Sequence, residues 1–228
     1  MEEIFTRTCC RIFDQSKRTN TVFSVDSILN IKELVDAKNL MNENYGNQYS
    51  HIPPHLAYTI MPFPEDNLEI GKKELVEYVQ QQKPFNVNLS DLMYEEKSKF
   101  FYVALDGEMI RKHHEYITLL LNKYRENYIR EQDLERLRNK DFDKVSQKYL
   151  IDYGYARVFE NYRTHVTVGN FTIENVNVDD LKNKLTKILE PILNKSINID
   201  NIHAVFHTDS SNNQSEMKQL WDKVFYLK

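Results

Sequence analysis

The sequence has 228 residues, of which 41% are hydrophobic and 28% are charged, and its formal net charge at pH 7 is −4. This length fits one large domain or two small lobes with a sizeable core. The negative charge excludes a global basic field for holding long duplex nucleic acid, although a small phosphorylated ligand needs only a local positive patch.

The cysteines and the hydrophobic segments limit the cellular context. Cys9 and Cys10 are the only cysteines, and two adjacent cysteines form no disulfide framework, which suits a reducing compartment. No Cys/His cluster has zinc-site spacing, so we expect no metal and no cofactor. The first 30 residues lack the apolar core of a signal peptide, and no stretch approaches the ~20 apolar residues that span a bilayer. We therefore expect a cytoplasmic protein without a membrane partner, whose oligomeric state the sequence leaves open.

The first half of the chain predicts strands and helices in alternation. Residues 1–20 are mixed and polar and predict no defined element. Alternating apolar and polar residues predict strands over 21–28, 55–61, 85–92 and 99–105. Helical spacing predicts helices over 31–42 and 68–82, and the segment 42–54, rich in Asn, Tyr, Gly and Pro, predicts a loop.

The second half repeats this order of elements. A helix is expected over 109–127, followed by a charged stretch, 130–150, with weaker helical periodicity. An aromatic loop over 153–159 leads to a strand over 163–171, then to a helix over 178–193. One or two strands within 197–207 and a last one over 221–227 complete the chain. The order predicts an α+β fold with two similar halves.

The strand R-T-H-V-T-V-G-N-F, residues 163–171, brings reactive side chains onto one face. Residues two apart on a strand point the same way, so Arg163, His165 and Thr167 are expected side by side. In the first half, H-L-A-Y-T begins the strand in the matching place. We expect His55 and Thr59 to share a face there, together with Ala57.

This pair of histidine strands resembles the 2H phosphoesterase superfamily, which carries one H-x-[ST]-x motif in each of two lobes. The likeness is nearest to a bacterial group associated with phosphonate metabolism, through the run Y-G-Y-A-R-V-F-E-N-Y-R-T-H-V-T over 153–167. The resemblance implies a single bilobal domain over 1–228, with two pseudo-symmetric antiparallel sheets and flanking helices around a central cleft. Residues 1–50 and 128–150 match nothing in this pattern and are expected as additions.

The resemblance implies that the protein opens a cyclic or 2′-linked phosphodiester on a nucleotide or RNA end, and the residue types suit this reaction. One imidazole, of His55 or His165, can take a proton from water while the other gives one to the leaving oxygen. Thr167 and Arg163 can hold the phosphate, with help from Thr59. Tyr162 is a further candidate for substrate binding. The scheme requires no metal, and the resemblance implies the same.

Ala57 departs from the pattern, because the first motif should have Ser or Thr there. Thr59 or Arg163 could replace the missing phosphate donor. The alternative is a catalytically weak or inactive module that binds a phosphorylated nucleotide or RNA end in the same cleft.

Other aromatic and histidine residues have structural interpretations. The aromatic residues of the segment 153–162 fit either base stacking or packing in the interior. His113 and His114 could suggest a metal site, but neighbouring residues of a helix do not share a face. They lie on a charged helix, and we expect them on its solvated face. His203 and His207 share one face of a strand and are expected to be structural.

Overall fold

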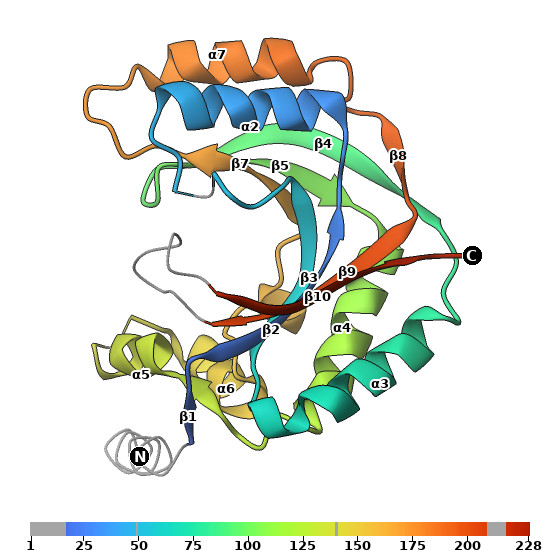
Figure 1. Ribbon diagram of the computed structural model, residues 1–228. Helices are drawn as coiled ribbons and strands as arrows, with labels where there is room; N and C mark the ends of the chain where they lie inside the picture. Colours follow the sequence, from blue (N-terminus) through green and yellow to red (C-terminus); the bar gives the residue numbers. More distant parts are fainter. Residues whose placement is uncertain (1–16, 49, 140, 209–217) are drawn as a thin grey trace.

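Eight strands form one antiparallel sheet in the computed structural model, which describes residues 17–48, 50–139, 141–208 and 218–228 (Figure 1). The strand order across the sheet is β10-β9-β2-β3-β7-β5-β4-β8. The strands are β2 (Thr21–Ile28), β3 (His55–Pro62), β4 (Phe85–Glu95), β5 (Phe100–Asp106), β7 (His165–Asn170), β8 (Ser196–Ile199), β9 (Asn201–Thr208) and β10 (Gln219–Tyr226). Cys9 and Cys10 lie outside the described residues, and the absence of a disulfide stays a prediction for them.

The sheet consists of two four-stranded halves that meet at one point. Leu56 on β3 lies opposite Val166 on β7, and this is the single pair that joins these two strands within the described residues. By contrast, β2 and β3 are paired from Val22 and Pro62 to Ile28 and His55, with one irregularity between Val25 and Asp26. The arrangement confirms the predicted α+β fold with two antiparallel halves, and we call the junction at Leu56 and Val166 the seam.

Two pairs of helices cover one face of the sheet, on its outer side in Figure 1. They are α2 (Lys32–Asn44) with α7 (Val178–Leu189), and α3 (Leu68–Val79) with α4 (Glu108–Asn122). The helix α4 packs on β3, and α2 packs on β7. Leu56 points toward the helices and is fully buried. The opposite side, onto which the partly exposed His55, Ala57, His165 and Thr167 project, is called the site face below.

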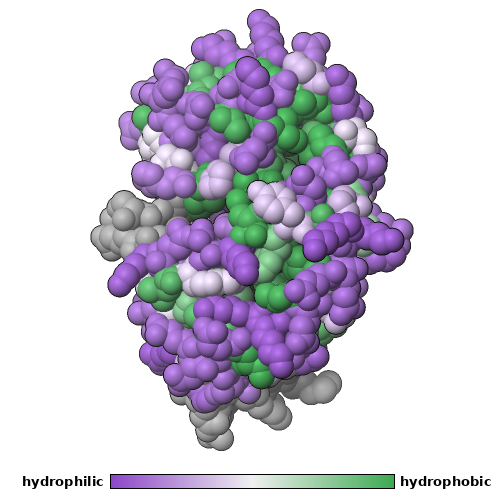
Figure 2. Space-filling model, turned by 45° about the vertical axis from the view of Figure 1, so that its right-hand side comes forward, coloured by the Kyte–Doolittle hydropathy of each residue, from purple (hydrophilic) through white to green (hydrophobic). Residues whose placement is uncertain are grey.

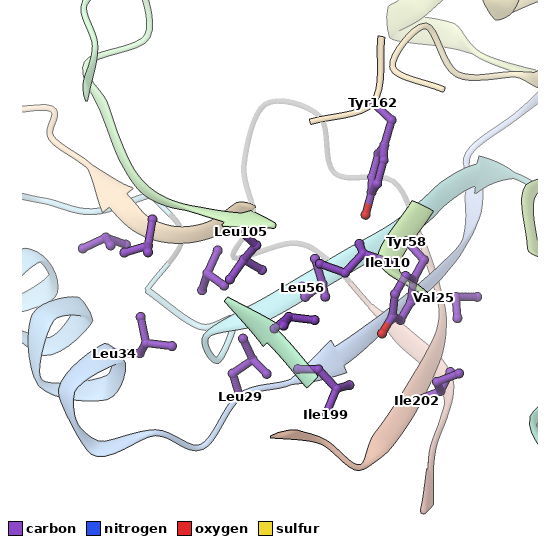
Figure 3. Packing of buried hydrophobic residues seen from close by; sticks show 14 of the residues in the cluster. Val25, Leu29, Leu34, Leu56, Tyr58, Leu105, Ile110, Tyr162, Ile199 and Ile202 are labelled. Carbon is purple, nitrogen blue, oxygen red and sulfur yellow. The ribbon is translucent and has the colours of Figure 1, made fainter. Parts of the chain in front are cut away.

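One hydrophobic core runs behind both halves (Figure 3). Leu34 from α2, Ile110 from α4 and Leu56 from the seam are each at most 1% exposed and belong to the same cluster. Burial of a leucine or isoleucine side chain stabilises a fold by about 1.5–3 kcal/mol. The two halves therefore share their main source of stability, although only one residue pair joins their strands.

The charged stretch around residues 128–150 forms a small satellite with its own core. It contains β6 (Ile129–Arg130), which pairs with β1 (Arg18–Thr19), and the helices α5 (Glu131–Arg138) and α6 (Lys144–Tyr153). Ile129, Leu134 and Leu150 pack together there. The helix α6 begins after Asp143, which accepts the N–H of Ser146, and ends at Gly154. Gly154 has a φ of +74°, a left-handed conformation that favours glycine and ends the helix.

The structure contains two 3-10 turns that the sequence did not predict. A 3-10 turn, η2 (Phe159–Asn161), precedes β7, and the strand begins at His165 instead of residue 163. A second such turn, η1 (Glu65–Asn67), precedes α3. The expected solvated face at His113 and His114 is wrong, because their side chains are 0% and 1% exposed. Helix α4 packs against β3, α3 and η2, and its buried face is wide enough to include both neighbouring histidines.

Hydrophilic side chains cover most of the surface seen in Figure 2, with apolar side chains between them. The large apolar residues that are exposed come from separate elements, such as Tyr116 on α4, Val145 on α6 and Tyr226 on β10. Within the described part of the chain, no helix combines the length and the apolar character needed to cross a membrane.

Candidate active site

The seam brings the two predicted histidines onto neighbouring strands. With Leu56 opposite Val166, the antiparallel register puts His55 opposite Thr167 and Ala57 opposite His165. Side chains directly opposite have their Cβ atoms about 4.5–5.5 Å apart, and diagonal neighbours such as the two histidines about 7–8 Å. The charge of His55 also contributes to the lowered pKa of His165, as expected for close rings. Both imidazoles are thus within reach of one phosphate group.

The two imidazoles are held in the same way. Nδ1 of His55 lies 2.9 Å from the carbonyl oxygen of Pro53, and Nδ1 of His165 lies 2.8 Å from that of Arg163. In each case the partner is the residue two positions earlier. A carbonyl oxygen can only accept a hydrogen bond, so Nδ1 carries the proton in both rings. Nε2 of each ring makes no hydrogen bond with the described residues and is the atom that can exchange a proton with a ligand.

The surroundings of His165 favour its neutral form. Burial lowers its pKa below 6.5, and the positive charges of Arg157 and Arg163 add to the effect, while its bond to the Arg163 carbonyl opposes it. With Nδ1 protonated, the neutral ring presents an unprotonated Nε2 to the site face. His165 is therefore suited to accept a proton at neutral pH.

Two arginines lie beside the histidines. Arg163 donates a hydrogen bond to Glu95 at 3.0 Å, and the side chains of this surface ion pair are 62% and 34% exposed. Arg157 is exposed and makes no hydrogen bond with the described residues, but its charge influences both His165 and Glu95. The sequence prediction included Arg163 and missed Arg157, although both belong to the basic and aromatic run before β7. Either guanidinium can bind a phosphate.

Two aromatic rings on β5 flank His165 on the site face. Tyr102 lies opposite Thr167 in the register, and its ring centroid is 5.4 Å from that of His165. Phe100 stacks on Tyr102 and lies 5.9 Å from His165. Both rings are partly exposed. The sequence prediction missed them, although the alternation over 99–105 places both on one face of the strand.

Thr59 does not share the face of His55, so this part of the prediction is wrong. The pairing of β2 with β3 shifts by one residue, with Asp26 opposite Ala57 but Val25 opposite Thr59. Tyr58 is the extra residue of this β-bulge, which reverses the alternation of faces beyond it. Thr59 therefore points toward α4, is 2% exposed, and bonds the hydroxyl of Thr118.

The hydroxyl and the ring of Tyr162 also make contacts inside the protein. Its side chain is 8% exposed, and its hydroxyl donates to the carbonyl oxygen of Ala57 at 2.6 Å. Figure 3 shows the hydroxyl directed toward β3. The ring stacks on His114 with centroids 3.8 Å apart. Tyr162 thus supports the strand of His55 from behind, and the prediction that it binds substrate is not supported by this burial.

A row of small and charged residues crosses the site face at His165. Ala104 on β5 and Ala57 on β3 are its neighbours on either side, so no large side chain flanks the ring along this row. Next along this row, Asp26 on β2 lies opposite Ala57, and His203 on β9 lies opposite Asp26. These last two form an ion pair of 3.0 Å between Oδ1 and Nδ1, with side chains 11% and 12% exposed. The structural interpretation of His203 thus agrees with this contact.

No group of three or more His, Cys, Asp and Glu side chains in the described ranges is arranged to hold a metal ion.

Comparison with known proteins relates the chain to one family. The family model described as "Protein of unknown function (DUF1045)" matches residues 67–214, which include β7 with His165 but not β3 with His55. A comparison with curated proteins gives no match.

Several solved structures resemble the chain at low sequence identity. TT0787 of Thermus thermophilus is 11% identical, with a TM-score of 0.54 over 91% of this chain and 99% of that one. E. coli LigT complexed with 3′-AMP is 9% identical, with a TM-score of 0.48 over 92% and 99% of the two chains. Usb1 of Kluyveromyces marxianus with uridine monophosphate is 14% identical, with a TM-score of 0.41 over 89% and 98%. The likeness to TT0787 concerns the fold alone.

Proposed function

We propose that this chain, which belongs to the DUF1045 family and has the bilobal fold of the 2H phosphoesterases, is a phosphodiesterase that uses His55 and His165 as its acid/base pair. The observation that carries the proposal is the matched anchoring of the two rings. Each Nδ1 is bound to a carbonyl two residues upstream, and each Nε2 is left for a ligand on the site face. General acid/base catalysis needs two such groups on opposite sides of one reacting phosphorus.

The direction of proton transfer follows from the surroundings of His165. His165, with its lowered pKa, is neutral in the resting state and takes a proton from the attacking water at Nε2. The new bond forms between this water oxygen and phosphorus as the bond to the leaving oxygen breaks. His55 in its protonated form gives its Nε2 proton to that leaving oxygen. The reaction is hydrolysis, and it requires no metal in this scheme.

Thr167 and the two arginines are proposed to hold the phosphate. Thr167 lies opposite His55, and its hydroxyl can donate to a nonbridging oxygen. Arg157 has no hydrogen-bond partner in the described residues, and Arg163 can exchange its exposed pair with Glu95 for a bidentate bond to phosphate. These groups provide the local positive patch that the net charge of −4 does not supply.

The proposed substrate is a cyclic or 2′-linked phosphodiester on a nucleotide or an RNA end. Phe100 and Tyr102 support this class, because partly exposed rings next to the histidines can stack on a base. Stacking of a base on an aromatic side chain contributes about 1–3 kcal/mol. The balance of charge disfavours a long duplex. A cytoplasmic location belongs to the same proposal.

A second candidate function is a module that binds the same ligand without turnover. Ala57 favours it, because the residue opposite His165 provides no hydroxyl for the phosphate. Loss of one such donor costs about 3 kcal/mol of transition-state stabilisation in other enzymes. Binding by Thr167 and the arginines would survive this loss.

The deciding experiment is turnover of 2′,3′-cyclic nucleotides in the presence of EDTA. We expect hydrolysis by the wild type, its loss in His55→Ala and in His165→Ala, and its retention in His207→Ala. His207 is a suitable control because it lies on β9 and bonds Ser24. Nucleotide binding without turnover in the wild type would establish the binding module instead. Turnover that survives in either of the first two variants would rule out the acid/base pair.

A further inference from the structure

The β-bulge next to the site leaves two carbonyl groups of β3 to be bound by side chains. The strands β3 and β7 separate beyond the seam, and Tyr58 is the extra residue of the bulge. Tyr162 donates to the carbonyl oxygen of Ala57 at 2.6 Å, and Nδ1 of His114 lies 2.5 Å from that of Tyr58. A buried carbonyl without a partner is costly, so these two side chains are needed where the ladder ends.

His114 uses both nitrogen atoms of its ring. Nδ1 must carry the proton, because the carbonyl of Tyr58 can only accept. Nε2 then accepts the backbone N–H of Phe159 at 2.9 Å. The side chain is 1% exposed, and burial lowers its pKa to about 4, so the neutral form persists at neutral pH. One ring therefore ties β3 to the segment that follows α6.

That segment carries both arginines of the site. Arg157 precedes Phe159 by two residues, and Arg163 directly follows Tyr162, whose ring lies parallel to that of His114 at 3.8 Å. Phe159 has a φ of +52°, which is unfavourable for a residue other than glycine. Such a conformation persists only where its surroundings hold it, and the bond to His114 is one such restraint.

We infer that His114 is a positioning residue of the active site, which fixes the arginine-bearing segment 157–163 relative to the strand of His55. This role rests on the proposed function in so far as these residues handle a phosphodiester. His114 itself does not reach the site face, since it lies behind β3 on α4. It sets the distance between the acid/base pair and the arginine side chains of the segment 157–163.

His113 provides a matched control on the same helix. It is 0% exposed, and burial lowers its pKa to about 4, as for His114. Its Nδ1, however, bonds the hydroxyl of Tyr78 on α3, and its ring packs on the rings of Tyr58, Tyr78 and Phe85. A substitution there removes a similarly buried imidazole and a ring contact with Tyr58, but it leaves the bonds to both β3 carbonyls and the bond to Phe159 in place.

The test compares His114→Asn and His114→Gln with His113→Asn. The asparagine amide lies near the position of Nδ1 and can still donate to Tyr58, whereas the glutamine amide reaches toward Phe159. Each His114 variant thus keeps one of the two bonds. We expect kcat/KM for a 2′,3′-cyclic nucleotide to fall about 10-fold in both, mainly through kcat, and to stay within twofold in His113→Asn.

A second readout needs no substrate. The charged or titratable groups around His165 are His55, Tyr102, Arg157 and Arg163. Arg163 lies close to β7, and its carbonyl stays bound to Nδ1 of His165. If the part of the segment around Arg157 moves away, the positive charge of Arg157 no longer lowers the pKa of His165, and the pKa measured by NMR titration rises. We expect this rise in both His114 variants and none in His113→Asn.

The two readouts separate failure of the inference from failure of the proposed function. An unchanged pKa of His165 in the His114 variants, or an equal change in His113→Asn, would overturn the positioning role, whatever the activity. If the wild type shows no turnover but the pKa responds as expected, the phosphodiesterase proposal fails and the positioning role stands.

Discussion

In the register set by Leu56 and Val166, Ala57 corresponds to His165 as Thr167 corresponds to His55. The two halves thus provide equivalent positions, except that Ala57 has a methyl group where Thr167 has a hydroxyl. Since a phosphate has two nonbridging oxygens, each histidine would normally stand across from one donor. The arginines beside β7 can supply positive charge near Ala57, where the hydroxyl donor is missing, but they do not occupy the position opposite His165.

Ala57→Thr should raise turnover of a 2′,3′-cyclic nucleotide by about 10-fold in kcat/KM, because it adds a phosphate donor beside His165. Ala57 is partly exposed on the site face, so space for the side chain exists. Steady-state kinetics check this, with Ala57→Val as a control of the same shape without the hydroxyl. If both variants lose activity, the natural substrate needs the space above Ala57.

Thr167→Val should lower kcat/KM by about 100-fold, mainly through kcat, because the lost hydroxyl acts on charge in the transition state. Thr59→Val is the matched control on β3. Thr59 faces α4 and bonds Thr118, so its loss should cost about 1 kcal/mol of unfolding free energy and leave kcat/KM within twofold. Equal effects of the two variants on turnover would contradict the assignment of Thr167 to the site.

The pH profile of kcat/KM should report the lowered pKa of His165. Burial and the charge of Arg157 both disfavour the imidazolium, so the base form persists to a pH below 6.5 and activity should decline only there. Arg157→Gln removes a positive charge, raises the pKa of His165 and moves the acid limb to higher pH. A profile whose acid limb is the same in wild type and Arg157→Gln would show that this arginine does not act on the base.

Tyr102→Leu should weaken the binding of a nucleotide substrate, because leucine keeps the apolar contact with Phe100 but cannot stack on a base. We expect a rise in KM of about 10-fold, which corresponds to about 1.4 kcal/mol, with kcat little changed. The control is a cyclic phosphodiester without a base, whose kinetics should be the same in both proteins. An equal loss with both substrates would assign Tyr102 to the support of His165.

Stability should fall between pH 6.5 and pH 4 because of His113 and His114. Burial lowers the pKa of each to about 4, so the unfolded chain binds these protons first as the pH falls, and protonation favours unfolding. Each histidine contributes a loss of about 3 kcal/mol over this range. The ion pair with Asp26 raises the pKa of His203 against the effect of burial, and its contribution is instead lost as the pH rises above 6.5.

Urea unfolding at pH 7.5 and pH 5 measures this difference. We expect a smaller unfolding free energy at pH 5, and a smaller difference between the two conditions in His113→Phe. A wild-type unfolding free energy that is equal at both pH values would contradict the burial of neutral imidazoles.

The sequence predicted the elements of the sheet well because alternation and helical spacing are local properties. The strand of His55, the helices on either side of it and the motif strand of β7 lie within a few residues of their expected bounds. The pairing of the two histidines was also predictable, since each begins a strand in a corresponding place of its half.

What the sequence could not predict depends on contacts between distant segments. The bulge at Tyr58 arises from the pairing of β3 with β2 and turns Thr59 away from the site. His114 and Tyr162 are polar residues whose partners are carbonyl groups of another strand, and no spacing along the chain indicates such partners. The role of Arg157 likewise follows from the path of a loop.

The single pair between Leu56 and Val166 has a consequence for the energetics of ligand binding. Apolar packing, which is non-directional, holds the two halves together more than a ladder of hydrogen bonds does. A phosphate bound by His55 and His165 at the same time would link the two halves non-covalently across this junction. The free energy of binding would then include the cost of fixing the two halves relative to each other. The ligand would also raise the unfolding free energy of the whole chain.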